Sequence, residues 1–157
     1  MNTDLESQFV ETWLICNRTN LYLLEAVPVA ALNNVSASKG RMVGEQFAHL
    51  HNVRLMWLKA AAPELLQGLE KIEKPDAADK KVLQKSLKDS GVAIEKLLRK
   101  GLAEGKIKGF KPHVAAFLGY LVSHESHHRG QIVLSLKQSG SPVDKKTGYG
   151  IWEWGVR

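Results

Sequence analysis

The sequence contains one cysteine, no long hydrophobic run and no basic, apolar leader, and each shortage excludes a class of protein. With Cys16 alone, the chain can form neither an intrachain disulfide bond nor a zinc site built from several cysteines. Its apolar runs are short and interrupted by charged residues, so we expect no membrane partner and no membrane span. The first residues, MNTDLESQ, do not resemble a secretory signal, so we expect a cytoplasmic protein. Cys16 lies within an apolar pattern that is typical of a buried core thiol.

The charged residues give the chain a net charge of +6, and most of the excess lies between residues 70 and 111. This segment holds 12 Lys or Arg residues against 7 Asp or Glu residues. A basic stripe can bind nucleic acid, but here the two signs alternate at helical spacing and no aromatic platform is present for stacking bases. We interpret the segment as a solvated helix face and expect no nucleic-acid partner.

The hydrophobic pattern predicts an all-α protein. A length of 157 residues suits one domain, residues 1–157, with a single core. No stretch alternates apolar and polar residues with a period of two, so a sheet is not expected. Apolar residues recur at helical spacing in four segments, which are residues 3–24, 42–61, 77–103 and 112–139. These segments predict a four-helix bundle of antiparallel helices, with the tail at 144–157 packed on it.

Capping residues indicate where the helices begin. Thr3 and Glu6 form a capping box for the first helix, and Asp76 suits the N-cap of the third. Pro112 suits the first turn of the fourth helix. In the tail, Trp152 and Trp154 either cover the mouth of a cavity or anchor the tail to the bundle.

The fourth helix carries the clearest candidate site. Residues 124–131 read HESHHRGQ, and the first five letters fit the zinc-protease pattern H-E-x-x-H. On a helical wheel, His128 and Glu125 fall inside the apolar stripe, His124 lies on its edge and His127 points away. Polar groups on a buried face are expensive unless they bind something or one another.

The second helix can supply a third ligand. His49 borders the apolar stripe of that helix, whereas His51 largely opposes it. We therefore expect a three-histidine metal site formed by His49, His124 and His128, although a histidine on an apolar face is often only a hydrogen-bonded core residue. The remaining histidines, His51, His113 and His127, are expected on the surface or as partners that orient a ligand.

A three-histidine site would leave a bound Zn²⁺ or Ni²⁺ with open coordination positions. Glu125 is the candidate to accept a proton from bound water or substrate, or else a carboxylate paired with Arg129 or with a neighbouring helix. Arg129 and Gln131 either position an anionic substrate or hold the end of the bundle or a dimer contact.

A zinc protease is the least favoured interpretation. Proteases with this motif usually take their third ligand from a residue downstream, and residues 131 and 134 are Gln and Leu. The later carboxylates, Asp144 and Glu153, both lie in the tail. The chain also has little room for the sheet that holds a peptide substrate.

The sequence resembles the DinB-like, or damage-inducible, superfamily of four-helix bundles. The resemblance rests on GEQFAHLHNVRLMWL at 44–58, SHESHHRGQI at 123–132 and YGIWEWG at 149–155. It implies a divalent metal held by His49, His124 and His128. It also implies a homodimer and a metal-dependent activity on a small molecule, either transfer of a low-molecular-weight thiol or hydrolysis. The alternative is a non-catalytic, stress-associated protein that binds metal.

Overall fold

The computed structural model describes residues 4–157, and within them it contains four long helices and no strand. The long helices are α1 (Leu5–Ala26), α2 (Val43–Ala61), α3 (Lys80–Glu104) and α4 (Val114–Gln138). The tail adds a short helix, α5 (Lys145–Gly150). Single turns of 3₁₀ helix connect these elements, namely η1 (Val29–Asn33), η2 (Pro63–Leu66), η3 (Lys74–Ala78) and η4 (Trp154–Val156). The expected all-α bundle is confirmed.

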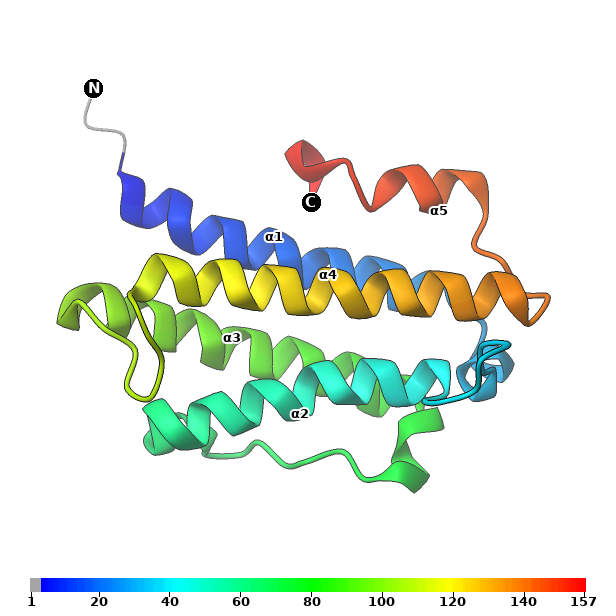
Figure 1. The fold of residues 1–157 in the computed structure, drawn as a ribbon, viewed down its shortest axis with the longest axis horizontal. Helices are drawn as coiled ribbons and strands as arrows, with labels where there is room; N and C mark the ends of the chain where they lie inside the picture. Colours follow the sequence, from blue (N-terminus) through cyan, green and yellow to red (C-terminus); the bar gives the residue numbers. More distant parts are fainter. Residues whose placement is uncertain (1–3) are drawn as a thin grey trace.

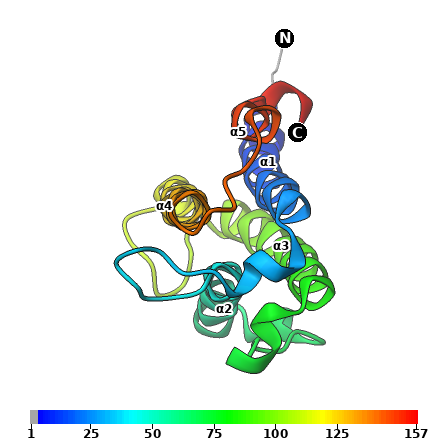
Figure 2. The same cartoon turned by 90° about the vertical axis from the view of Figure 1, so that its right-hand side faces the viewer.

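The four long helices pack side by side in two antiparallel pairs. Figure 1 shows that α1 and α4 run in one direction and that α2 and α3 run in the other. The contacts join α1 to α3 and α2 to α4 as antiparallel pairs, and Figure 2 shows α5 outside the bundle next to α1. None of the helices in residues 4–157 combines the length and apolarity that crossing a membrane requires.

Two helix starts differ from the sequence prediction. The N-cap of α1 is Asp4, whose carboxylate accepts hydrogen bonds from the backbone N–H groups of Glu6 and Ser7. The expected capping box falls on Thr3, which lies outside the described residues. The fourth helix begins at Val114 rather than at Pro112, because the His113 ring accepts the Ala116 N–H at 3.1 Å and so caps the first turn.

The connection between α2 and α3 explains two further differences. Residues 62–79 return along the whole length of α2, so α2 and α3 run in the same direction (Figure 1). Asp76 lies within η3 on this return path, and the N-cap of α3 is Asp79, whose carboxylate accepts the N–H groups of Lys81 and Val82. The prediction of Asp76 as the cap is therefore wrong by three residues.

The same connection buries His51, which is only 1% exposed. One ring nitrogen lies 3.0 Å from the carbonyl oxygen of Ser86 on α3, and the other lies 2.7 Å from that of Glu70 in the connection. The surface position expected for His51 is therefore wrong. A helical wheel of α2 alone shows no partner on this face, because one partner is a loop with no helical pattern and the other belongs to α3.

Buried polar residues form a band across the middle of the bundle. In each long helix, the buried polar positions other than Gln46 and Ser135 fall between one apolar cluster and the other. The band contains Asn17 and Asn20 of α1, His51 and Arg54 of α2, Ser90 of α3, and Glu125, His128 and Arg129 of α4. Every helix therefore contributes polar groups at the level of the candidate metal ligands.

The C-terminal tail is attached to α1 through Tyr22. A Cβ atom on Gly150 would lie 2.2 Å from the Tyr22 hydroxyl, so any larger residue there would have to displace the Tyr22 ring. The Arg157 guanidinium lies 3.6 Å from the centre of the Tyr22 ring, and its Nε donates to the Gly150 carbonyl. Trp152 is 77% exposed and contributes little to this attachment.

Candidate metal centre

The three histidines expected to bind metal lie together between α2 and α4. The Nε2 atoms of His49 and His124 are 3.3 Å apart, and the ring of His128 lies 4.5 Å from that of His49 and 4.6 Å from that of His124, measured between centroids. One nitrogen from each ring lies within 4.8 Å of the other two. Residues that are 75 positions apart in the sequence thus present their nitrogens to one point.

The spacing of the His49 and His124 nitrogens suits a tetrahedral cation. Imidazole nitrogens bind Zn²⁺ at about 2.0–2.1 Å, so two of them at the tetrahedral angle lie about 3.3–3.4 Å apart. The observed separation between His49 and His124 agrees with this value. Two neutral imidazoles with their nitrogens this close can share at most one proton between them, and a cation satisfies both lone pairs.

Gln46 fixes the orientation of His128. The Nδ1 atom of His128 lies 2.7 Å from the Gln46 side-chain oxygen, which can only accept. This hydrogen bond places the proton on Nδ1 and leaves the Nε2 lone pair free, the arrangement typical of a metal-bound histidine. The sequence analysis missed Gln46, although its position one turn before His49 on α2 places it on the same helix face.

Burial keeps the three imidazoles neutral. It lowers the pKa of His49 to about 4, with smaller contributions from the charges of Arg41 and His124. It also lowers the pKa of His128 to about 4, helped by the neighbouring His49 and His124, and lowers the pKa of His124. Neutral rings offer lone pairs to a cation at neutral pH, which protonated rings cannot do.

The cluster is partly exposed at the surface of the protein. His49 and His124 are half-buried, whereas His128 is buried. Within residues 4–157, no fourth His, Cys, Asp or Glu joins the group. Three protein ligands and an accessible side are features of catalytic zinc sites rather than of closed structural ones.

Glu125 lies in the core and is held by Arg54 of α2. Its two carboxylate oxygens accept hydrogen bonds from Arg54 Nε at 2.7 Å and from a terminal nitrogen of Arg54 at 2.9 Å. Asn20 donates a third bond at 2.5 Å, and Glu125 is 1% exposed. The Arg54 charge and these hydrogen bonds outweigh burial and lower the pKa of Glu125. The geometry favours the paired carboxylate, with Arg54 rather than Arg129 as its partner, and the role of proton acceptor stays a prediction.

Two other candidate residues, Arg129 and Gln131, follow the fourth-helix ligands on α4. Arg129 turns away from the histidines towards α1, where it donates to the Asn20 side-chain oxygen at 2.7 Å, and it also donates to Ser126 on its own helix at 2.8 Å. Gln131 is half-buried, and its role in positioning a substrate stays a prediction. His127 is exposed, as expected.

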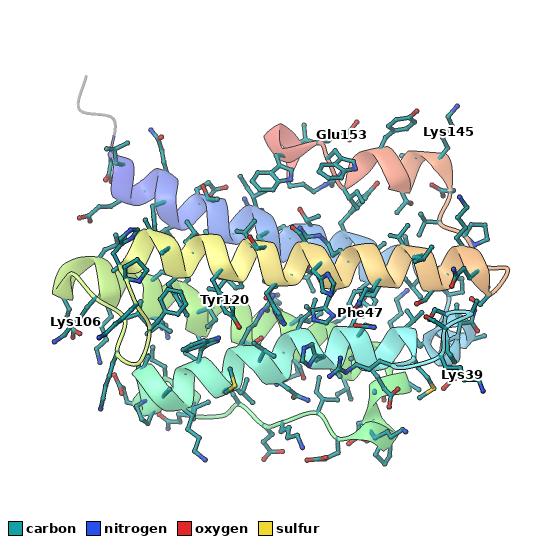
Figure 3. All side chains as sticks on the ribbon, viewed as in Figure 1. Lys39, Phe47, Lys106, Tyr120, Lys145 and Glu153 are labelled. Carbon is teal, nitrogen blue, oxygen red and sulfur yellow. The ribbon has the colours of Figure 1, made fainter. Side chains whose placement is uncertain are left out.

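An aromatic cluster adjoins the metal ligands. The ring of Tyr120, which Figure 3 labels, is stacked on that of His124, with centroids 6.0 Å apart and planes 14° apart. The Trp57 ring of α2 packs edge-on against the rings of Tyr120, Phe110 and Phe117, with ring centroids 5.4–5.6 Å apart. Sequence analysis missed this cluster as part of the site, and it gives one side of the site an apolar border.

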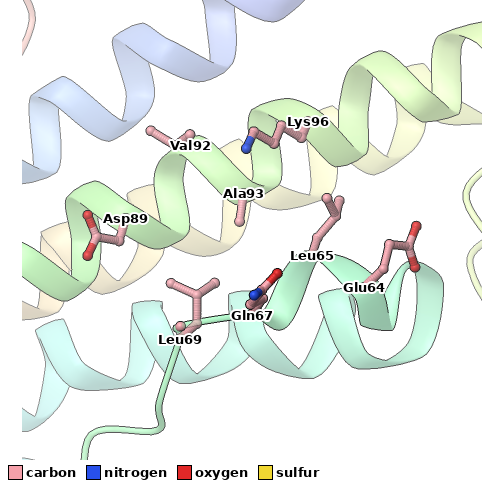
Figure 4. A pocket seen from close by; sticks show the side chains of 9 residues that line it. Glu64, Leu65, Gln67, Leu69, Asp89, Val92, Ala93 and Lys96 are labelled. Atoms are coloured by element: carbon pink, nitrogen blue, oxygen red, sulfur yellow. The ribbon is translucent and has the colours of Figure 1, made fainter.

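A separate hollow of about 370 Å³ lies between α3 and residues 64–69. Figure 4 shows Glu64, Asp89 and Lys96 around its rim, with Leu65 and Leu69 lining it. None of the three candidate metal ligands lines this hollow, so it is not part of the histidine site.

Comparison with known proteins gives a family match over most of the chain. The family described as the DinB family matches residues 1–150. Searches of curated proteins and of solved structures found no match.

Proposed function

The chain belongs to the DinB family, and we propose that it is a metal-dependent enzyme that transfers a low-molecular-weight thiol to or from a small molecule. The observation that carries this proposal is the convergence of His49, His124 and His128 on one point, with no fourth protein ligand among residues 4–157. Zn²⁺ and Ni²⁺ are among the cations that imidazole ligands suit.

The protein residues prepare the site for a cation. Burial keeps the three rings neutral, and Gln46 holds His128 in the tautomer whose Nε2 is free. A bound divalent cation would supply Lewis acidity, which lowers the pKa of a coordinated thiol or water. Tyr120 and Trp57 provide an apolar border against which the body of a small substrate can pack.

The position of Glu125 argues against an H-E-x-x-H protease. Such a protease uses the glutamate of the motif as the general base that activates the attacking water. Both oxygens of Glu125 are bonded to Arg54 in the core, so the carboxylate is not free for that task. A thiol on a divalent cation loses its proton without a carboxylate base, so the chemistry we propose needs no further acidic residue.

Metal content and thiol-dependent turnover test the proposal together. We expect the purified protein to hold about one equivalent of Zn²⁺ or Ni²⁺, as three ligands to a single ion require. His49→Ala should lose this metal, while His127→Ala, which alters an exposed histidine of α4 beside the ligand His128, should keep it. Turnover with a panel of low-molecular-weight thiols and electrophiles should be lost on chelation and return when the metal is restored.

The alternative is a non-catalytic protein that carries the metal. One equivalent of metal without metal-dependent turnover on thiol, ester, amide and phosphate substrates would establish that alternative. Metal content that is negligible in the wild type and unchanged in His49→Ala would contradict both proposals.

A further inference from the structure

A cavity of about 330 Å³ lies between α4 and the C-terminal tail. From α4 it is lined by Ser126, Arg129, Gly130 and Val133, and the tail contributes a mainly apolar wall that includes Ile151, Trp152 and Trp154. At 100° per residue, Ser126 and Gly130 lie nearly opposite His124 and His128 on the helix. The cavity therefore opens on the other side of α4 from the candidate metal centre.

Arg129 is the charged residue of this cavity, and it lacks an acidic partner. Its side chain is almost fully buried, at 7% exposure, although it lines the hollow. It donates to the Asn20 oxygen, to Ser126 and, at 3.6 Å, to the Cys16 sulfur. Among residues 4–157, no ion pair includes Arg129. A guanidinium has five N–H donors, so these three bonds leave two without a partner.

The buried charges around Arg129 do not balance. Two guanidinium groups, those of Arg54 and Arg129, share the core with the single carboxylate of Glu125. That carboxylate is already bonded to Arg54 and Asn20. Cys16 adds no negative charge, because burial raises the pKa of its thiol to about 12. One positive charge thus remains unpaired beside the cavity, and buried charges are normally paired.

We propose that this cavity binds a small carboxylate with an apolar body. The carboxylate pairs with the free donors of Arg129, and the apolar body packs against Trp152, Trp154 and Ile151. Planar guanidinium groups bind carboxylates with two parallel hydrogen bonds, which matches the two donors left over. The volume lies at the lower end of the range for ligand pockets, about 300–1,000 Å³, so the ligand is small.

Charge complementarity favours this occupant over a second copy of the chain. Arg129 lines the hollow and is nearly covered, so only a narrow group that enters the cavity reaches it. The site does not depend on the proposed thiol transfer, since the cavity includes none of the three histidines.

Equilibrium dialysis with matched acids and amides tests the proposal. The probes are phenylacetate, 1-naphthylacetate and octanoate, each compared with its neutral amide, on the full chain with its metal and after chelation. We expect at least one acid to bind saturably with a dissociation constant below about 1 mM, and at least about tenfold more tightly than its amide. Binding should survive chelation, which separates this cavity from carboxylate coordination at the histidine site.

Two glycines of α4 provide a matched pair of variants. A Cβ atom added at Gly130 or at Gly119 meets no atom within 4 Å, and both are exposed positions on the same helix. Gly130 lines the cavity, whereas Gly119 does not. Gly130→Leu should therefore fill the cavity and abolish binding of the acids, whereas Gly119→Leu should leave that binding unchanged. Both substitutions should favour the helical conformation of α4. Arg129→Gln should remove the preference for acids, with circular dichroism confirming the fold.

Three results would overturn the proposal. They are equal binding of acids and amides, wild-type binding in Gly130→Leu, and no saturation of any probe below about 10 mM. If none of the probes binds and Gly130→Leu converts a dimer to a monomer in sedimentation equilibrium, the cavity is instead a contact between two copies of the chain.

Discussion

Replacing Glu125 with glutamine distinguishes a structural carboxylate from a catalytic one. Glutamine has nearly the same shape but puts an N–H₂ group where an oxygen now accepts hydrogen bonds from Arg54 or Asn20. Arg54 is 0% exposed, so its charge is left without a counter-ion in the core. Breaking a buried ion pair in this way costs about 3–5 kcal/mol. For a chain of this size we expect the melting temperature to fall by roughly 10 °C.

The assay combines thermal unfolding with turnover measured at a temperature where the variant is still folded. We expect Glu125→Gln to keep its metal and to lose less than about tenfold in kcat, whereas loss of a general base would cost about 10²–10⁴-fold. Glu11→Gln is the control, because it removes an exposed ion pair with Arg18 and should change the stability by less than about 1 kcal/mol. An unchanged melting temperature together with a hundredfold loss of turnover would refute the structural interpretation and restore Glu125 as the base.

The other predictions concern the histidine cluster. Gln46→Ala should weaken metal binding by about 10–100-fold, because His128 loses the acceptor that orients it. A competition assay with a chromophoric chelator measures this affinity. The control Gln84→Ala removes a hydrogen bond to Glu25 and should leave metal binding unchanged. His128→Ala should abolish metal binding and remove the stabilisation against heat that added metal gives the wild type. The metal-free protein should lose stability as the pH falls from 6.5 towards 4. The unfolded chain takes up protons near pH 6.5, whereas folded His49 and His128 resist protonation until about pH 4. Denaturant titrations across this range should show a shallower loss in a His49→Ala, His128→Ala double variant, and an equal loss would contradict the pKa shifts.

The sequence predicts the three metal ligands because the spacing of the two fourth-helix histidines matches the repeat of an α-helix. His124 and His128 are four residues apart, so they must lie on one face of any helix that contains both. The apolar stripe then indicates which face is turned inwards, and the same argument chooses His49 over His51 on α2. The structure brings the three chosen rings together. This part of the site depends only on local geometry, which a wheel represents well.

A helical wheel does not predict the burial or the partner of a residue whose contacts come from another part of the chain. His51 is buried by a connection without helical pattern, and its two carbonyl partners come from Glu70 and Ser86. Glu125 was correctly placed in the core, but its partner Arg54 belongs to another helix. Pairings between helices depend on their register, which the periodicity of one sequence does not contain.

The positions of Arg54 and Glu125 show which contacts hold the histidine cluster together. Arg54 follows His49 by five residues on α2, and Glu125 directly follows His124 on α4, so the ion pair and the ligands join the same two helices at the same level. Because Arg54 also donates to Leu87 and Ser90 of α3, and Asn20 binds Glu125 from α1, the pair is fixed by all four helices. Relative sliding of α2 and α4 would break these bonds before it separated the histidines. The four-helix network therefore holds the rings in place, and a cation can bind without first bringing two helices together.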